Sequence, residues 1–191
     1  MTKGFTISVN ATPLPSEGEE LHVAAMNTDP EMTEMKEEQA AERRVLVLGV
    51  GNVLLSDEGV GVHVANELMK RELPSNVSVV EGGTDGFRLL NHITEADRLI
   101  VVDAVRGGGE PGSIYQFDID DVRNTPSGFK TSVHQIGILE VIDLSGLICK
   151  TPETTVIGVE PKSLEMGLEL SPEVQAKIPR VIELVLEALE N

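Results

Sequence analysis

Short apolar runs that end in polar residues constrain the fold of this chain more than any other feature of its sequence. Residues 45–50, VLVLGV, are apolar throughout, as in a parallel strand that is buried on both faces of its sheet. Similar runs cover residues 77–80, 99–105 and 154–159, and segments with a helical pattern separate them. This alternation predicts an α/β fold with a mostly parallel sheet flanked by helices.

The segments between these runs predict the helices. Residues 59–72 carry Val60, Val64 and Leu68 at helical spacing, on one stripe. We also expect helices over residues 86–95, 135–148 and 172–190.

Prolines and glycines add local detail to this prediction. Ser171 and Pro172 suit the N-cap and first turn of the last helix, and Pro179 should kink it. Residues 113–119 alternate as a strand and follow a tight glycine-rich loop, so this strand is expected to run antiparallel at an edge.

The first 43 residues differ from the rest of the chain. They hold nine acidic residues, three prolines and no sustained hydrophobic period. We predict a flexible acidic extension over residues 1–43 and a single domain over residues 44–191. The extension should be dispensable for activity, so a chain that starts at Arg44 is expected to stay folded and active.

Composition narrows the function classes. The net charge of −17 argues against nucleic acid as a partner. No apolar run reaches the length of a membrane span, and the first residues lack the apolar core of a secretion signal. The single cysteine, Cys149, excludes an internal disulfide and favours a reducing compartment. We therefore expect a cytoplasmic protein, and a monomer.

Polar residues follow the predicted strands where a ligand site is expected in an open parallel sheet. A Glu, an Asp and a His from this group would form a ligand set for zinc, nickel or another borderline divalent ion, with coordination positions left open. Acids in this place suit a cation and would repel a phosphate. The candidates are Asp57 and Glu58 after the first strand, Glu81 after the second, Asp103 after the third, and His134 in the loop before the helix 135–148.

Other interpretations of these residues stay open at this point. Asp57 could serve only as a helix cap, and a lone histidine such as His134 is more often structural than a ligand. Gly49, Gly51 and Glu81 could instead belong to a degenerate dinucleotide-binding module without catalytic activity, although the third glycine of that motif is replaced by Leu54. The sequence contains neither an HExxH helix nor a GxSxG elbow, which excludes proteases built on those motifs.

Five segments together resemble one known family. They are VLVLGVGNVLLSDEGVGV, EGGTDG, LIVVDAV, VHQIG and GVEPKSLEMGLELSPEV, which occur in this order over about residues 44–190. The sequence resembles the maturation endopeptidases of nickel–iron hydrogenases. The resemblance implies a twisted five-stranded sheet flanked by helices, and removal of a C-terminal extension from the precursor of the hydrogenase large subunit, in the cytoplasm, after nickel insertion.

The resemblance also implies site residues. The Glu that closes the first motif, the Asp that ends the third strand and the His before Gln bind a metal in that family, and here they are Glu58, Asp103 and His134. Nickel would come with the precursor, and Asp57 or Glu81 could act as a general base. Two features depart from the family: the extension 1–43 has no counterpart, and the acid before Gly82, often Asp in relatives, is Glu81.

Overall fold

The computed structural model describes residues 43–84, 86–120, 130–131 and 133–190. For residues 86–87, 130–131 and 133–139 it describes the backbone only. The predicted flexible extension lies outside the described residues except for Arg43, so its boundary with the domain stays a prediction.

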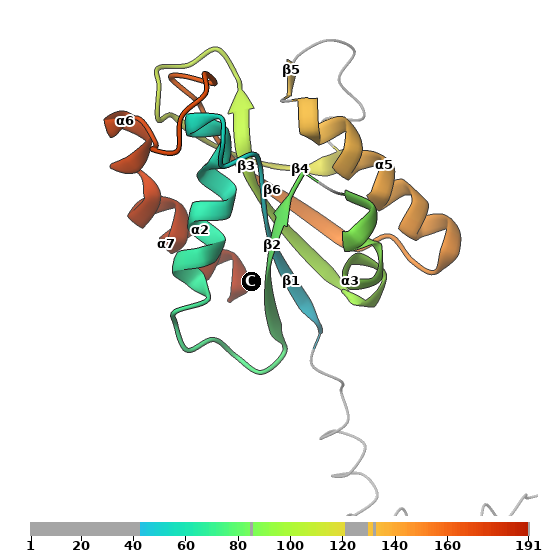
Figure 1. Cartoon of the computed structure of the whole chain (residues 1–191). Coiled ribbons are helices and arrows are strands. Elements are labelled where there is room, and N and C mark those ends of the chain that lie inside the picture. The colour runs from blue at the N-terminus through green and yellow to red at the C-terminus, as the bar shows by residue number, and fades with distance from the viewer. Residues whose placement is uncertain (1–42, 85, 121–129, 132, 191) are drawn as a thin grey trace, which may run out of the picture. The chain divides into compact units, whose positions relative to one another are not determined.

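The described part is built around a six-stranded sheet with the order β2-β1-β3-β6-β4, in which β5 pairs with β3 away from this path (Figure 1). Neighbours among β1, β2, β3 and β6 run parallel, and β4 runs antiparallel to β6 at one edge. The mostly parallel sheet and its antiparallel edge strand are thus confirmed. The strands are β1 (Val45–Val50), β2 (Val77–Gly83), β3 (Arg98–Arg106), β4 (Ile114–Asp118), β5 (Lys130–Thr131) and β6 (Glu153–Val159).

Helices cover both faces of the sheet. Figure 1 shows α2 and α7 on one face, and α3 and α5 on the other. Two short 3₁₀ helices, η1 and η2, precede α2 and α3. The bounds are η1 (Ser56–Gly59), α2 (Val60–Leu68), η2 (Gly86–Leu89), α3 (Leu90–Glu95), α5 (Val133–Ile148), α6 (Pro172–Gln175) and α7 (Ile178–Leu189).

Each face of the sheet has its own hydrophobic core, because successive side chains of a strand point to opposite faces. On β3, Ile100 and Val102 pack into the core beneath α2 and α7, whereas Leu99 and Val101 pack into the core beneath α3 and α5. All four are at most 1% exposed. Burial on both faces explains why this strand reads as a continuous apolar run.

Several predicted helix boundaries need correction. The helix expected over 59–72 begins as η1 and ends at Leu68, because the side chains that follow it are exposed and have no core to cover. The single kinked helix expected over 172–190 is two helices, with Pro179 in the first turn of the second. A proline lacks the backbone N–H that an interior turn requires, but a first turn has no use for that N–H.

Two further differences lie near the carboxyl ends of the strands. α5 begins at Val133, so His134 lies in the first turn of a helix and not in the preceding loop. β5, which the sequence did not predict, pairs Lys130 with Arg106 and Thr131 with Val105. In the described part of the chain, every helix is too short or too polar to cross a bilayer.

Candidate functional site

The chain leaves β1 through a turn that packs unusually tightly. Gly51 has φ of +133°, and a Cβ there would lie 1.8 Å from the carbonyl oxygen of Glu58. A Cβ on Gly61 would lie 2.1 Å from the carbonyl oxygen of Val102. Glycine at both positions lets η1 and the start of α2 sit directly against the ends of β1 and β3. Gly51 therefore serves the sharp turn and the close packing after β1.

Asp57, in η1, is fully buried and holds the loop that follows β6. Its Oδ2 accepts hydrogen bonds from the backbone N–H of Lys162 at 2.9 Å and of Ser163 at 3.0 Å. The backbone N–H of Ser171 donates to Oδ1 at 2.6 Å, and the Ser171 hydroxyl donates to Oδ2 at 2.9 Å. The interpretation of Asp57 as a helix cap is wrong, since η1 has no side-chain cap. Because both oxygens are engaged, the structure also argues against Asp57 as a general base.

The residue before Asp57 carries backbone strain. Ser56 has φ of +49°, in the left-handed region that non-glycine residues rarely adopt. The loop after β6 holds it there: Ser56 N–H donates to the carbonyl oxygen of Gly167 at 2.8 Å, and its hydroxyl donates to that of Glu165 at 3.0 Å. Strain of this kind concentrates at functional sites, where the surrounding structure enforces it.

Glu58, in η1, follows β1, whereas Asp103 lies inside β3 and not after it as predicted, because the buried strand continues through Ala104 and Val105. Glu58 is 4% exposed and Asp103 is fully buried. η1 contacts β3, so the two residues come from neighbouring elements at the same edge of the sheet. Asp103 Oδ1 accepts a hydrogen bond from the N–H of Ala104 at 2.7 Å. Burying carboxylates is costly unless hydrogen bonds, charges or metal ions compensate, so such a pair indicates a site.

The backbone brings His134 toward the same edge. Thr131 pairs with Val105, two residues beyond Asp103, and α5 begins two residues after Thr131. His134 therefore belongs to the helical turn that starts beside the end of β3. Its side chain lies outside the described part, and among the side chains that are described, no three His, Cys, Asp or Glu residues form a group that could hold a metal.

Glu81, the remaining sequence-predicted candidate, lies inside β2 and not after it as predicted, because pairing with β1 extends the strand to Gly83; its side chain is exposed. It lines a cavity of about 360 Å³ together with Thr84, Arg88 and His92. Glu81 pairs with Gly49, so it lies one strand away from the turn that leads to Glu58.

A further buried acid, Glu160, was missed as a functional candidate by sequence reasoning. Its Oε2 accepts hydrogen bonds from the N–H groups of Gly107 at 2.8 Å, Gly108 at 3.0 Å and Gly109 at 3.2 Å, and from the Tyr115 hydroxyl at 2.7 Å. Consecutive backbone N–H groups that converge in this way form an anion-binding nest. The three consecutive glycines are the sequence signal that could have predicted it.

The surroundings of the nest shift the pKa values of Glu160 and Tyr115. Burial alone would raise the pKa of Glu160, but the hydrogen bonds from Tyr115 and the three amides outweigh it, so the pKa is lowered from its ordinary value. Burial and the adjacent Glu160 carboxylate raise the pKa of Tyr115. Glu160 is therefore an ionised structural acid that fixes the glycine loop beside the carboxyl edge of the sheet.

The sequence of this chain, including Asp103 and the first turn of α5, matches a known family. The family model described as hydrogenase maturation protease matches residues 62–188. The chain belongs to the hydrogenase maturation protease family. A similar curated relative is the hydrogenase expression/formation protein HupD of Bradyrhizobium diazoefficiens, which is 42% identical over 151 residues, or 78% of this chain and 79% of the relative.

Other members of the family extend this similarity. The hydrogenase 2 maturation protease of Escherichia coli is 40% identical over 153 residues, which cover 78% of this chain and 92% of the relative. The solved structure of the hydrogenase maturating endopeptidase HybD from E. coli matches with a TM-score of 0.68 at 38% identity, over 77% of this chain and 92% of that one. The HybD protease from Thermococcus kodakarensis matches with a TM-score of 0.67 at 29% identity, over 76% of this chain and 98% of that one.

These similarities confirm the family resemblance and identify the chain as an endopeptidase of this family. The alternative of a dinucleotide-binding module gains no support from them. It also has a physical difficulty, because the position that a Cβ on Gly51 would occupy is filled by the chain's own Glu58 carbonyl. Gly51 is the second glycine of the motif, where a pyrophosphate needs close approach to the backbone.

Proposed function

We propose that this protein is the endopeptidase that removes a C-terminal extension from the nickel-loaded precursor of a nickel–iron hydrogenase large subunit. The observation that carries this proposal is the pair of buried carboxylates, Glu58 and Asp103, at the carboxyl edge of the sheet. Membership of the maturation protease family gives the reaction class, and the buried pair supports a site for that reaction at this edge.

The proposed role of the pair is to contact the nickel that the substrate carries. Glu58 and Asp103 supply oxygen donors, and His134 supplies an imidazole nitrogen, which together suit a borderline divalent ion and leave coordination positions for the substrate. This set contains no thiolate, so cysteine ligands in the precursor hold nickel more strongly. Nickel is therefore part of the substrate, and the enzyme detects whether it has been inserted.

Two routes to peptide hydrolysis are compatible with this arrangement. The metal of the precursor could polarise the scissile carbonyl or activate a water molecule, with the three side chains as its ligands. Alternatively the metal only docks the substrate, and a carboxylate acts as general base. The contacts of Asp57 leave Glu81 as the base in the second route, because its side chain is exposed at the rim of the 360 Å³ cavity.

A folded protein substrate also needs a docking surface beyond the metal. Leu54, Met166 and Leu168 are 55%, 88% and 69% exposed. The loops that carry them are joined by hydrogen bonds, since Gly167 N–H donates to the carbonyl oxygen of Leu54 at 3.0 Å. Exposed apolar side chains next to a site are typical of surfaces that bind another protein. The precursor is expected to dock here, in the cytoplasm, with a monomeric enzyme.

The test compares two forms of the precursor with the same chelator-treated enzyme. Precursor loaded with nickel should be shortened by the mass of its extension, whereas precursor from nickel-starved cells should stay intact. Efficient cleavage of the nickel-free form would overturn the sensor role and leave a protease that needs no substrate nickel.

The His134→Ala variant tests the ligand set in the same assay. It should lose cleavage while its thermal unfolding stays close to that of the wild type, because a ligand in the first turn of a helix adds little to the core. A strongly destabilised variant would indicate a structural histidine instead.

A further inference from the structure

On its outer side, β2 pairs with no strand in the part of the chain that the structure describes. β2 pairs with β1 alone in the described part of the chain, which makes it one end of the sheet. Its sequence, VSVVEGG, contains neither the Pro nor the Lys with which proteins often protect such edges. An unpaired edge of this kind can accept a further strand.

The direction of the backbone groups along β2 follows from one hydrogen bond. Val45 N–H donates to the carbonyl oxygen of Asn76 at 2.9 Å, so the backbone carbonyl of Asn76 points toward β1. The backbone N–H and C=O groups of successive residues along a parallel strand point to alternate sides. Those of Ser78 and Val80 therefore also point toward β1, and those of Val79 and Glu81 point outward. The N–H of Val77 is already bonded to the carbonyl oxygen of Pro74 at 3.0 Å. Val79 and Glu81 therefore carry the outward N–H groups available to a partner.

A groove follows this edge on the side of α3. One cavity of about 160 Å³ is lined by Ser75, Asn76, Ser78 and His92 at the amino end of β2. The cavity of about 360 Å³ lies at the carboxyl end and is also lined by His92. His92 lines both cavities, and between them they border β2 at its amino end, where β1 also contributes, and at its carboxyl end. At its far end the groove reaches Glu81, one strand from the turn that leads to Glu58.

The walls of the groove are less acidic than the chain as a whole. Arg44 and Arg88 line it beside Glu81 and Glu95, so the charges of these four side chains balance. In a chain with a net charge of −17, such a groove repels an acidic group less than the average surface of the chain does. It therefore suits a peptide that ends in a carboxylate better than a second copy of this acidic chain.

We propose that the C-terminal extension of the precursor binds as an added strand along the outer edge of β2, with Val79 and Glu81 supplying backbone hydrogen bonds. This inference rests on the proposed function and adds the mode of peptide recognition. Backbone pairing holds an extended chain without demanding a particular sequence, and the end of β2 delivers it to the edge where Glu58 lies. The enzyme then binds one substrate through two separate contacts, one with its nickel ion and one with the backbone of its C-terminal extension.

Hydrogen exchange measured by mass spectrometry on the full chain tests the proposal directly. With nickel-loaded precursor bound, exchange in the segment Val77–Gly83 should slow at least about tenfold at the amides of Val79 and Glu81. The segment Ile114–Asp118, on the opposite edge of the sheet, should not change. Unchanged exchange over Val77–Gly83 while the wild type cuts the precursor would overturn the proposal. Slow exchange there without precursor, rising with enzyme concentration, would show a second copy on the edge and would also overturn it.

Three variants separate backbone pairing from side-chain packing. Val79→Pro removes an outward N–H, which an edge strand tolerates, and should lower kcat/KM for the precursor about tenfold through a higher KM. Val79→Ala keeps that N–H and should stay within about twofold of the wild type. Gln116→Pro is the matched control on β4. Because Glu160 N–H donates to the carbonyl oxygen of Ser113, alternation along β4 directs the backbone N–H of Gln116 away from β6, so this change also removes an outward N–H. It should have no effect on cleavage.

Failure of this inference can be told apart from failure of the proposed function. If the wild type does not cut nickel-loaded precursor, the proposed function fails. If the wild type cuts and Val79→Pro, folded by circular dichroism, cuts equally well, only the strand proposal fails. Should Val79→Pro not fold, the exchange experiment on the wild type still decides the question.

Discussion

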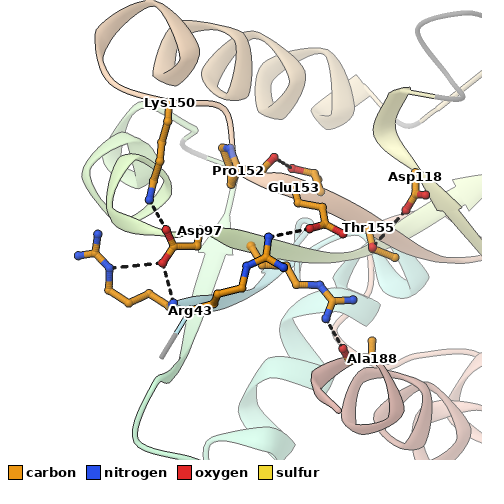
Figure 2. A network of polar contacts seen from close by, with 11 residues as sticks. Arg43, Asp97, Asp118, Lys150, Pro152, Glu153, Thr155 and Ala188 are labelled. Atoms are coloured by element: carbon orange, nitrogen blue, oxygen red, sulfur yellow. Dashed lines mark hydrogen bonds and ion pairs between the residues drawn. The ribbon is translucent and has the colours of Figure 1, made fainter. Parts of the chain in front are cut away.

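Acidic side chains at the two ends of the sheet differ in exposure and in the partners that they contact. At the amino end, Figure 2 shows acids beside basic side chains: Lys150 contacts Asp97, and Arg43 donates to Glu153 at 2.9 Å. These side chains are between about a third and two thirds exposed. At the carboxyl end, Asp57, Glu58 and Asp103 are at most 4% exposed. For Asp57, the partners are backbone amides and a hydroxyl.

This difference in exposure distinguishes acidic side chains in surface ion pairs from acidic side chains that form a buried site. Exposed ion pairs contribute little, because water and salt screen them. A buried carboxylate must be compensated by its surroundings, and removing it disturbs whatever compensates it. A count of acidic residues along the sequence does not distinguish the two ends, whereas burial does.

The largest effect is expected for the buried pair. Glu58→Gln and Asp103→Asn keep the shape of each side chain but remove its charge, so each should lower cleavage of nickel-loaded precursor by 10²- to 10³-fold, or about 3 to 4 kcal/mol. Unfolding free energy should change much less than activity. The measurement is the rate of precursor shortening beside thermal unfolding of each variant. Cleavage near the wild-type rate in either variant would remove that residue from the site.

The next effect concerns Asp57 and separates anchoring from catalysis. Asp57→Ala leaves the N–H groups of Lys162, Ser163 and Ser171 without their acceptor, which should cost about 3 kcal/mol of unfolding free energy. Urea unfolding measures this loss. Cleavage per folded molecule should fall far less than for Glu58→Gln. A stable Asp57→Ala variant that is inactive would return Asp57 to the list of catalytic residues.

The third effect is pH-dependent and concerns Glu160. Its pKa is lowered in the folded state, so its stabilising effect is present above the pKa of the unfolded chain, about 4.3, and is lost as the pH falls through the lower folded value. Glu160→Gln should therefore be less stable than the wild type at pH 7, by about 2 kcal/mol. The gap should narrow in acid titrations of unfolding free energy as the pH falls through the lowered pKa of folded Glu160. A gap that is independent of pH would indicate that shape and not charge matters in the nest.

The smallest effect belongs to the amino end. The contact with Lys150, together with the N–H of Arg44, lowers the pKa of Asp97, but the side chain is 34% exposed and its pairing is screened. Asp97→Asn should cost less than about 1 kcal/mol, and even this loss should shrink in high salt. Cleavage should be unchanged, which makes Asp97→Asn the control for Glu58→Gln. A large loss of activity would break the contrast between the two ends.

Sequence patterns predicted most of the sheet for a clear reason. Strands buried on both faces read as unbroken apolar runs, so residues 45–50 and 99–105 marked β1 and most of β3. The alternation over 113–119 marked β4 and its antiparallel direction. β5 had no such signal, because a two-residue strand exists only through its pairing with Val105 and Arg106. The two-helix ending was missed because a proline reads as a kink until the start of α7 is known.

The sequence by itself determined the fold class, the family and the group of polar residues at the carboxyl ends of the strands. These depend on local pattern and motif order, which the chain carries without folding. Only the tertiary structure decided what each acid does: Asp57 became an anchor once the loop over 162–171 placed its backbone amides around it. Glu160 became the centre of a nest in the same way. Partners that lie 50 to more than 100 residues away are fixed by packing, and so the roles of these acids are properties of the folded chain.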